Sequence, residues 1–205
     1  MKTESIINTN INFNNDIETF YNHLSKNIKC TNVLVIGGAG TIGASYIKQI
    51  LKYKPSKITV VDINENGLTE LTRDLRSSSL LDYNPEYITY PVNLLSNTFN
   101  KIFNSESWQV VANFSAHKHV RSEKDKISVE ALIKNNVYGA IKLLNLCELN
   151  PPKYFFSVST DKAANPVNIM GASKSLMEKL ILSKKDQFRV STARFANVAF
   201  SNGSL

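Results

Sequence analysis

The chain has 205 residues, 42% of them hydrophobic and 20% charged, with two cysteines and a formal net charge of +7. This composition is typical of a soluble globular protein with one substantial core, and because the longest apolar runs are far shorter than a bilayer is thick, it predicts no transmembrane helix. The N-terminus does not resemble a signal peptide, so we expect a cytoplasmic protein. The basic residues are scattered without a nucleic-acid-binding signature, and Cys30 and Cys147 lack metal-ligand spacing. We therefore expect binding of neither nucleic acid nor a metal ion.

Residues 1–29 are predicted to form an N-terminal extension. Only its later half has a pattern, because apolar residues recur there at helical spacing: Ile17, Phe20, Tyr21, Leu24 and Ile28. The pattern is compatible both with a short helix that docks on the following domain and with a partly ordered tail.

A strand, a tight turn and a helix start are predicted where the apolar run 33–36 passes directly into a glycine-rich segment. Gly37 would permit the sharp turn, Gly40 would let the backbone approach a pyrophosphate, and Gly43 would let the following helix pack closely. The helix N-terminus would offer N–H groups and the positive end of its dipole to phosphates. The pattern therefore predicts a dinucleotide-binding turn.

A second strand, 57–62, ends in Asp62, at the distance from the glycines where this fingerprint places its acidic residue. The carboxylate is placed to accept hydrogen bonds from an adenosine ribose, and it would repel a 2′-phosphate. The sequence therefore favours NAD over NADP.

Strands and helices alternate through residues 30–205, which predicts one α/β domain with a doubly wound parallel sheet and helices on both faces. Besides the two strands above, the expected strands are 87–92, 108–114, 153–159 and 188–195, and the expected helices are 41–53, 68–77, 128–149 and 171–184.

Two polar clusters follow strands of this predicted sheet, at 113–119 and 157–162. Each alone is compatible with a solvated turn. Ligands of such sheets bind beyond the carboxyl ends of the strands, so two clusters at that edge, beside the glycine loop, favour an active site.

Taken together, the motifs resemble the nucleotide-sugar 4,6-dehydratases of the extended short-chain dehydrogenase/reductase superfamily, in its polysaccharide-biosynthesis, CapD-like branch. The resemblance covers nearly everything after the N-terminal extension. The segments that carry it are GGAGTIG at 37–43, SAHKHV at 115–120, NVYG at 136–139, STDKAANP at 159–166, NIMGASK at 168–174 and RFANV at 194–198.

The resemblance implies a tightly held NAD and a UDP-sugar substrate that is oxidised at C4, loses its C5 proton and its C6 hydroxyl, and is reduced at C6. Lys162 could remove the C5 proton, because oxidation at C4 makes that proton acidic. Asp161 could protonate the leaving C6 oxygen if its environment raises its pKa, and Thr160 could hydrogen-bond the C4 oxygen. Lys174 would hold the nicotinamide ribose and supply positive potential.

The resemblance also assigns binding residues by position. Those expected at the cofactor are Gly37, Gly40, Thr41, Ile42, Gly43, Asp62, Asn93, Ser115, Ala116 and Lys174, and those expected at the substrate are Lys118, His119 and Asn197.

Three departures from the family pattern matter. The usual tyrosine, four residues before Lys174, is Met170, whose thioether cannot accept a proton, so Lys118, Asp161 and Lys162 are the candidate bases for C4 oxidation. Asn93 stands where relatives place an aspartate near the adenine. The chain ends where the family's smaller substrate domain would begin, so we expect mainly a cofactor domain.

Two alternatives to the dehydratase stay open from the sequence: a nucleotide-sugar 4-epimerase and a non-catalytic NAD-binding remnant. The identity of the sugar and the fate of its C5 centre also stay open. Members of the family commonly form dimers or larger assemblies. By that resemblance we expect a homo-oligomer with contacts through helices 128–149 and 171–184.

Overall fold

The computed structural model describes residues 13–118, 123–196 and 198. Its centre is a six-stranded parallel sheet in the order β3-β2-β1-β4-β5-β6. The strands are β1 (Asn32–Ile36), β2 (Lys57–Asp62), β3 (Glu86–Pro91), β4 (Val110–Asn113), β5 (Tyr154–Thr160) and β6 (Arg189–Phe195).

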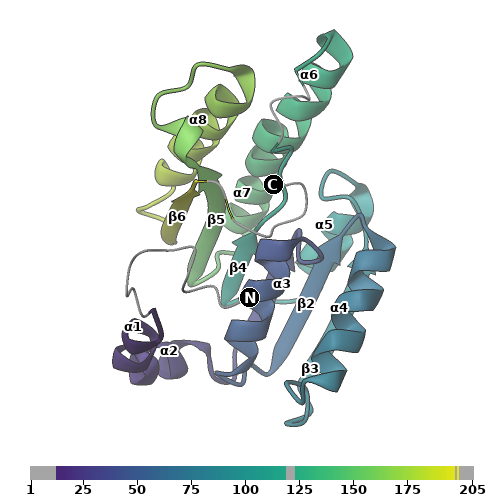
Figure 1. Cartoon of the computed structure of the whole chain (residues 1–205), viewed down its shortest axis with the longest axis vertical. Helices are drawn as coiled ribbons and strands as arrows, with labels where there is room; N and C mark the ends of the chain where they lie inside the picture. The colour runs from purple at the N-terminus through teal and green to yellow at the C-terminus, as the bar shows by residue number, and fades with distance from the viewer. Residues whose placement is uncertain (1–12, 119–122, 197, 199–205) are drawn as a thin grey trace, which may run out of the picture.

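Helices precede and connect these strands (Figure 1). They are α1 (Phe13–Thr19), α2 (Tyr21–Ile28), α3 (Thr41–Leu51), α4 (Glu65–Ser77), α5 (Asn97–Asn104), α6 (Lys126–Ile133), α7 (Gly139–Leu149) and α8 (Ile169–Leu182). A π-helical turn, Lys134–Tyr138, joins α6 to α7, and a 3-10 turn, Asp161–Ala163, follows β5.

This architecture confirms the predicted Rossmann-type, doubly wound sheet. All six strands occur where the sequence predicts them, although β4 is shorter than expected. The predicted helix 128–149 is α6, the π-helical turn and α7 in succession, and α5 has no counterpart among the predicted helices.

The hydrophobic core lies on both faces of the sheet, because alternate residues of each strand point to opposite sides. Leu34 and Ile36 of β1 belong to the cluster that packs on α5, α7 and α8, whereas Val33 and Val35 belong to the cluster that packs on α3 and α4. Two-sided burial explains why the four residues of β1 after Asn32 are all apolar.

The N-terminal helices contact the amino end of the sheet. Asn27 of α2 accepts hydrogen bonds through Oδ1 from the Tyr154 hydroxyl, at 2.8 Å, and from Lys153 Nζ, at 3.1 Å. These contacts lie at the start of β5, at the edge of the sheet opposite its carboxyl ends.

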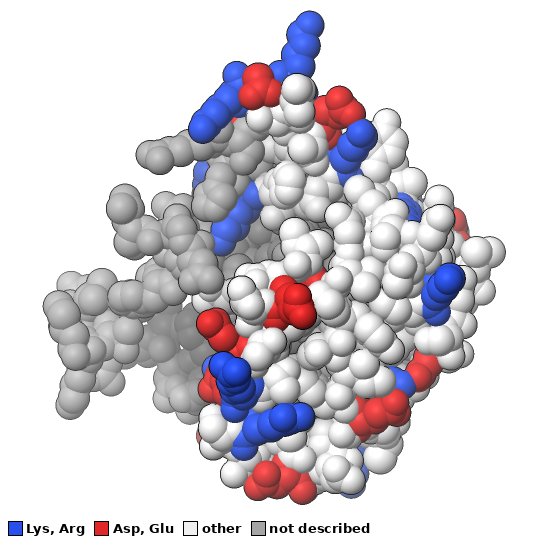
Figure 2. Space-filling view, turned by 90° about the vertical axis from the view of Figure 1, so that its right-hand side faces the viewer, with Lys and Arg blue, Asp and Glu red and all other residues white. Residues whose placement is uncertain are grey.

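Within the described ranges, no helix is long and apolar enough to cross a membrane. No group of three or more His, Cys, Asp or Glu residues in the same ranges is arranged to hold a metal ion. On the face that Figure 2 shows, Lys and Arg side chains are interspersed with Asp and Glu.

Candidate functional site

A cavity of about 800 Å³ opens at the carboxyl ends of the strands. It lies beside the neighbouring strands β1 and β4, between which the strand order reverses, since β2 and β3 lie on one side of this pair and β5 and β6 on the other. This is the point at which doubly wound sheets bind their ligands. The predicted site residues that line it are Gly37, Gly40, Thr41, Ile42, Gly43, Asp62, Asn93, Ser115, Ala116, Lys118, Thr160, Lys162, Met170 and Lys174. Asp161 is outside this lining, and His119 and Asn197 lie outside the described residues.

The glycine loop is shaped by close backbone contacts. Gly37 has φ of +74°, and a Cβ there would lie 2.5 Å from the backbone nitrogen of Ser115. A Cβ on Gly43 would overlap the carbonyl oxygen of Gly37. At Gly40, by contrast, a Cβ would find its nearest atom at 3.6 Å, in open space that faces the cavity. Gly37 and Gly43 are thus required by the fold, and Gly40 leaves room for a ligand.

The Asp62 carboxylate links the glycine loop to the start of α4. Its Oδ2 accepts a hydrogen bond from the Ala39 nitrogen at 3.0 Å, and its Oδ1 accepts one from the Asn64 nitrogen at 2.9 Å. The backbone fixes the carboxylate at the cavity wall, and each oxygen keeps acceptor capacity for a further donor.

Polar side chains at the end of β4 shape the adjoining part of the wall. Asn113 is buried, and its Oδ1 accepts hydrogen bonds from the Ser115 nitrogen, at 3.1 Å, and the Ser115 hydroxyl, at 2.7 Å. This Asx-type turn redirects the chain so that Ser115 and Ala116 line the cavity beside the glycine loop, with the Ser115 backbone packed against Gly37.

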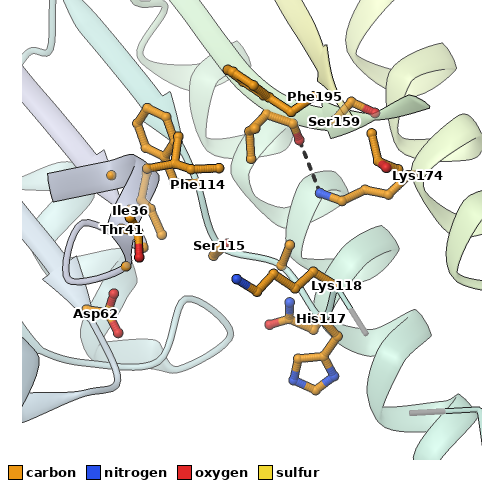
Figure 3. Close-up of a pocket in the computed structure, with 18 of the residues that line it drawn as sticks. Ile36, Thr41, Asp62, Phe114, Ser115, His117, Lys118, Ser159, Lys174 and Phe195 are labelled. Carbon is orange, nitrogen blue, oxygen red and sulfur yellow. Dashed lines mark hydrogen bonds between the residues drawn. The ribbon is translucent and has the colours of Figure 1, made fainter. Parts of the chain in front are cut away.

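Lys174 is buried in the wall formed by α8 and β5. Its Nζ donates a hydrogen bond to the carbonyl oxygen of Val158 at 3.1 Å (Figure 3) and lies 3.6 Å from Met177 Sδ. Burial lowers the pKa of Lys174 to about 8, although the negative charge of Glu178 opposes the shift. Near neutral pH the amine is therefore close to its titration point.

The Thr160–Asp161–Lys162 cluster is formed where β5 passes into the 3-10 turn. The Thr160 hydroxyl donates to Asp161 Oδ1 at 2.9 Å, and Lys162 Nζ pairs with the same oxygen at 3.2 Å. The hydrogen bond from Thr160 and the contact with Lys162 lower the pKa of Asp161. The predicted role of Asp161 as an acid requires a raised pKa, whereas these contacts lower it.

Met170 occupies the first turn of α8, four residues before Lys174. Its side chain is buried and lines the cavity. Its backbone nitrogen donates a 2.6 Å hydrogen bond to Glu123 Oε1, from the loop that follows β4.

The sequence analysis gave no individual role to three polar residues at this site, although two of them lie in segments that it singled out. Ser159 lines the cavity, and its buried hydroxyl makes no hydrogen bond of normal geometry among the described residues. Asn136 and Glu123 brace the cavity walls from positions far apart in the chain. The alternation of Ser157 with Ser159 was an available signal for an inward-facing hydroxyl, whereas the contacts of Asn136 and Glu123 depend on the tertiary fold.

A family described as polysaccharide biosynthesis protein matches residues 33–205. The chain belongs to this family. As the motifs predicted, it lies in the polysaccharide-biosynthesis branch of the extended short-chain dehydrogenase/reductases. Members of this group of enzymes carry the names of nucleotide-sugar dehydratases and epimerases.

Two relatives and one solved structure illustrate the similarity. An uncharacterized membrane protein of Methanocaldococcus jannaschii is 34% identical over 195 residues, which is 93% of this chain and 54% of that protein. A UDP-N-acetylglucosamine 4,6-dehydratase (inverting) of Campylobacter jejuni is 31% identical over 180 residues, 85% of this chain and 51% of the relative. The structure of Pen from Bacillus thuringiensis has a TM-score of 0.73 at 28% identity, covering 87% and 53% of the two chains. The chain spans about half the length of these relatives.

Proposed function

We propose that this chain carries the cofactor site and the catalytic cluster of an NAD-dependent nucleotide-sugar 4,6-dehydratase. The substrate is a UDP-N-acetylhexosamine, and the product serves surface polysaccharide biosynthesis. The observation that carries the proposal is the convergence of the glycine loop, Asp62, Lys174 and the pair Thr160 and Lys162 on one cavity.

The cavity wall fits a dinucleotide. The open space at Gly40 beside the N-terminus of α3 suits a pyrophosphate, because a helix N-terminus attracts phosphate. Asp62 suits ribose hydroxyls, which can donate to its remaining lone pairs, and Lys174 suits the nicotinamide ribose. NAD bound there would supply the acceptor of hydride from C4 and the donor of hydride to C6.

The chain's own side chains supply the proton transfers. Lys162, half-exposed at the cavity wall, takes the C5 proton as a neutral amine once the C4 carbonyl has made that proton acidic. Transfer of the Lys162 ammonium proton to its partner Asp161 supplies both this neutral amine and a protonated acid. Asp161 delivers a proton to the departing C6 oxygen, for which the bound sugar must displace its contacts with Thr160 and Lys162. Lys118, Asp161 and Lys162 are the candidate bases for the C4 hydroxyl, since Met170 has no proton-accepting group.

The first test is a titration of the chain with NADH and, separately, with NADPH, followed by nicotinamide fluorescence. Saturable binding with a preference for NADH is expected, because the Asp62 carboxylate repels a 2′-phosphate. A folded, cofactor-free sample that binds neither nucleotide would contradict the cofactor site and favour a non-catalytic remnant.

The second test incubates the protein that carries this chain with NAD and UDP-N-acetylglucosamine in deuterated water. A dehydratase releases one water from the sugar and introduces solvent deuterium at C5. A sugar nucleotide recovered intact, with no deuterium at C5, from an NAD-loaded protein would rule out dehydration of that substrate.

The structure also contains an observation that favours a second candidate, a nucleotide-sugar 4-epimerase. The lowered pKa of Asp161 disfavours the protonated acid that C6 elimination requires, and 4-epimerisation requires no such acid. Inversion at C4, without loss of water and without deuterium at C5, would identify that activity in the same experiment.

A further inference from the structure

The loop after β4 is joined to the π-helical turn and to α8 by a continuous series of hydrogen bonds. On one side, the His117 nitrogen donates to Asn136 Oδ1 at 2.9 Å, and Asn136 Nδ2 donates to the His117 carbonyl oxygen at 3.0 Å. The side-chain amide of Asn136 thus pairs with the backbone of His117 as a neighbouring strand would. Residue 117 is held against the π-helical turn Lys134–Tyr138.

The series continues from Asn136 to α8. Asn136 Nδ2 also donates to the Ser173 hydroxyl at 3.0 Å, and that hydroxyl donates to the Met170 carbonyl oxygen at 2.7 Å. Asn136 and Ser173 are both buried. In a buried, satisfied network each bond polarises the next, so this connection is rigid.

Glu123 forms the last hydrogen bond of the series. Its Oε1 accepts the Met170 nitrogen at 2.6 Å, across 47 residues of sequence. The N-cap of α8 is a different residue, Asn168, which accepts from the Gly171 nitrogen at 2.7 Å. The Glu123 carboxylate is therefore an additional acceptor at this helix start, where the positive end of the dipole favours an anion.

This arrangement fixes two walls of the cavity relative to each other. Lys118 lies between the two anchored residues of the loop, and its amine extends into the cavity toward Ser115 in Figure 3. Met170 and Lys174 form the part of the wall that α8 contributes. His117, the neighbour of Lys118, is tied to the first turn of α8 through Asn136 and Ser173. Glu123 holds the Met170 nitrogen in that same turn, so the distance between Lys118 and the α8 wall is set by the series.

We infer that Glu123 is a positioning residue, which by holding Met170 and its own loop together sets Lys118 at its working distance from the α8 wall of the active site. This inference rests on the proposed function for the role of Lys118 at the substrate. The hydrogen-bond series itself does not depend on that function.

The kinetic test compares Glu123→Ala with Glu123→Gln in the protein that carries this chain. Glu123→Ala removes the acceptor of the Met170 nitrogen, and misplacement of a substrate-binding group by about 1 Å costs up to about a hundredfold, so we expect KM for the UDP-sugar to rise about tenfold or more. Glu123→Gln keeps an acceptor oxygen and should restore most of the loss. NADH affinity should change far less than KM in both variants.

Asp125→Ala is the matched control. Asp125 belongs to the same loop and caps α6 through the Ile127 and Ser128 nitrogens, at 2.8 and 2.9 Å, and it does not line the cavity. We expect both Glu123→Ala and Asp125→Ala to lose a few degrees of Tm, and we expect Asp125→Ala to keep the wild-type KM. A wild-type KM in Glu123→Ala, or an equal rise in Asp125→Ala, would overturn the inference.

Amide hydrogen exchange tests the series in the 205-residue chain without any substrate. Glu123→Ala should accelerate exchange at Met170 and His117 relative to Asp125→Ala, and Ser173→Ala, which opens the series elsewhere, should do so if Glu123→Ala fails to fold. Exchange unchanged at both amides would overturn the positioning role. A wild-type protein that lacks turnover but shows the expected exchange would instead contradict the proposed function alone.

Discussion

The side-chain amine of Lys174 is buried beside the thioether of Met177. In the superfamily pattern a tyrosine hydroxyl stands one helical turn before this lysine, and here Met170 fills that place. Within the described residues, Lys174 Nζ has the Val158 carbonyl oxygen and Met177 Sδ as its hydrogen-bond acceptors. Neither carries a full negative charge, so burial of the ammonium form is costly, and this cost appears as the pKa of about 8.

This pKa predicts how the stability of the cofactor-free chain depends on pH. The folded value lies below the unfolded value of 10.5, so between these pH values the unfolded chain binds the extra proton and stability rises with pH. Relative to Lys174→Met, the wild-type free energy of unfolding should increase by roughly 2–3 kcal/mol from pH 8 to pH 10. Denaturant unfolding at several pH values measures this difference.

Lys174→Arg provides the control at the same position, because arginine stays charged through this range. Its stability should not rise with pH relative to Lys174→Met. Wild-type and Lys174→Met curves that run parallel from pH 8 to pH 10 would show that the amine does not titrate there.

For single residues, the sequence predicted which ones belong to the site better than it predicted their protonation states. The segment 159–162 was assigned to the site, and Thr160 and Lys162 do line the cavity. The charge state of Asp161 could not be predicted, because it depends on side-chain rotamers that bring Thr160 and Lys162 to the same carboxylate oxygen. Such contacts leave no mark in residue spacing.

At the scale of elements, the turn from β1 to α3 separates glycines required for folding from a glycine required for binding. Gly43→Ala should destabilise the chain by about 1–3 kcal/mol, because its Cβ overlaps the Gly37 carbonyl oxygen. Gly40→Ala should cost less than about 1 kcal/mol, since the nearest atom is 3.6 Å away. Thermal unfolding without nucleotide measures both effects.

Gly40→Ala, which should cost little stability, should weaken the binding of the dinucleotide. A methyl group placed at a close contact with a pyrophosphate costs about 1–3 kcal/mol, so NADH should bind about tenfold or more weakly to a chain of nearly normal stability. Wild-type NADH affinity in Gly40→Ala would refute the assignment of the pyrophosphate to this turn.

The elements that the sequence predicted well are those with a strong local pattern. Uninterrupted apolar runs marked β1 and β2, because parallel strands are buried on both faces. Helix α5 was missed because its three buried side chains, Phe99, Ile102 and Phe103, stand among asparagines in only eight residues. The π-helical turn has no signature of its own, and the hydrogen bonds of Asn136 that it supports are formed with residues distant in the chain.

For the molecule as a whole, the two ends of the parallel strands differ in their polar residues. We call the side of the sheet where the strands begin its amino edge and the side where they end its carboxyl edge. The carboxyl edge holds the cavity and the polar groups that line it. The amino edge holds Lys57, nearly buried, paired with Glu86 and Glu106. Burial lowers the pKa of Lys57, but the hydrogen bonds of Glu106 and Glu86 outweigh this and raise it overall. This network ties β2 to β3 and to the segment before β4, so we assign it to stability.

Lys57→Met should therefore weaken the fold without affecting the ligand site. The substitution leaves two carboxylates without their cation, and because Glu86 is 59% exposed and Glu106 25% exposed, water compensates part of the loss. We expect a cost of about 1–2 kcal/mol, or about 2–8 °C in Tm, with an unchanged Kd for NADH.

Lys48→Met is the matched control, since Lys48 pairs with Asp74 at 2.5 Å on the surface, where both side chains are at least 40% exposed. Equal Tm values for the two variants would show that the amino-edge network adds no stability, and weaker NADH binding by Lys57→Met would show that the two edges of the sheet are coupled.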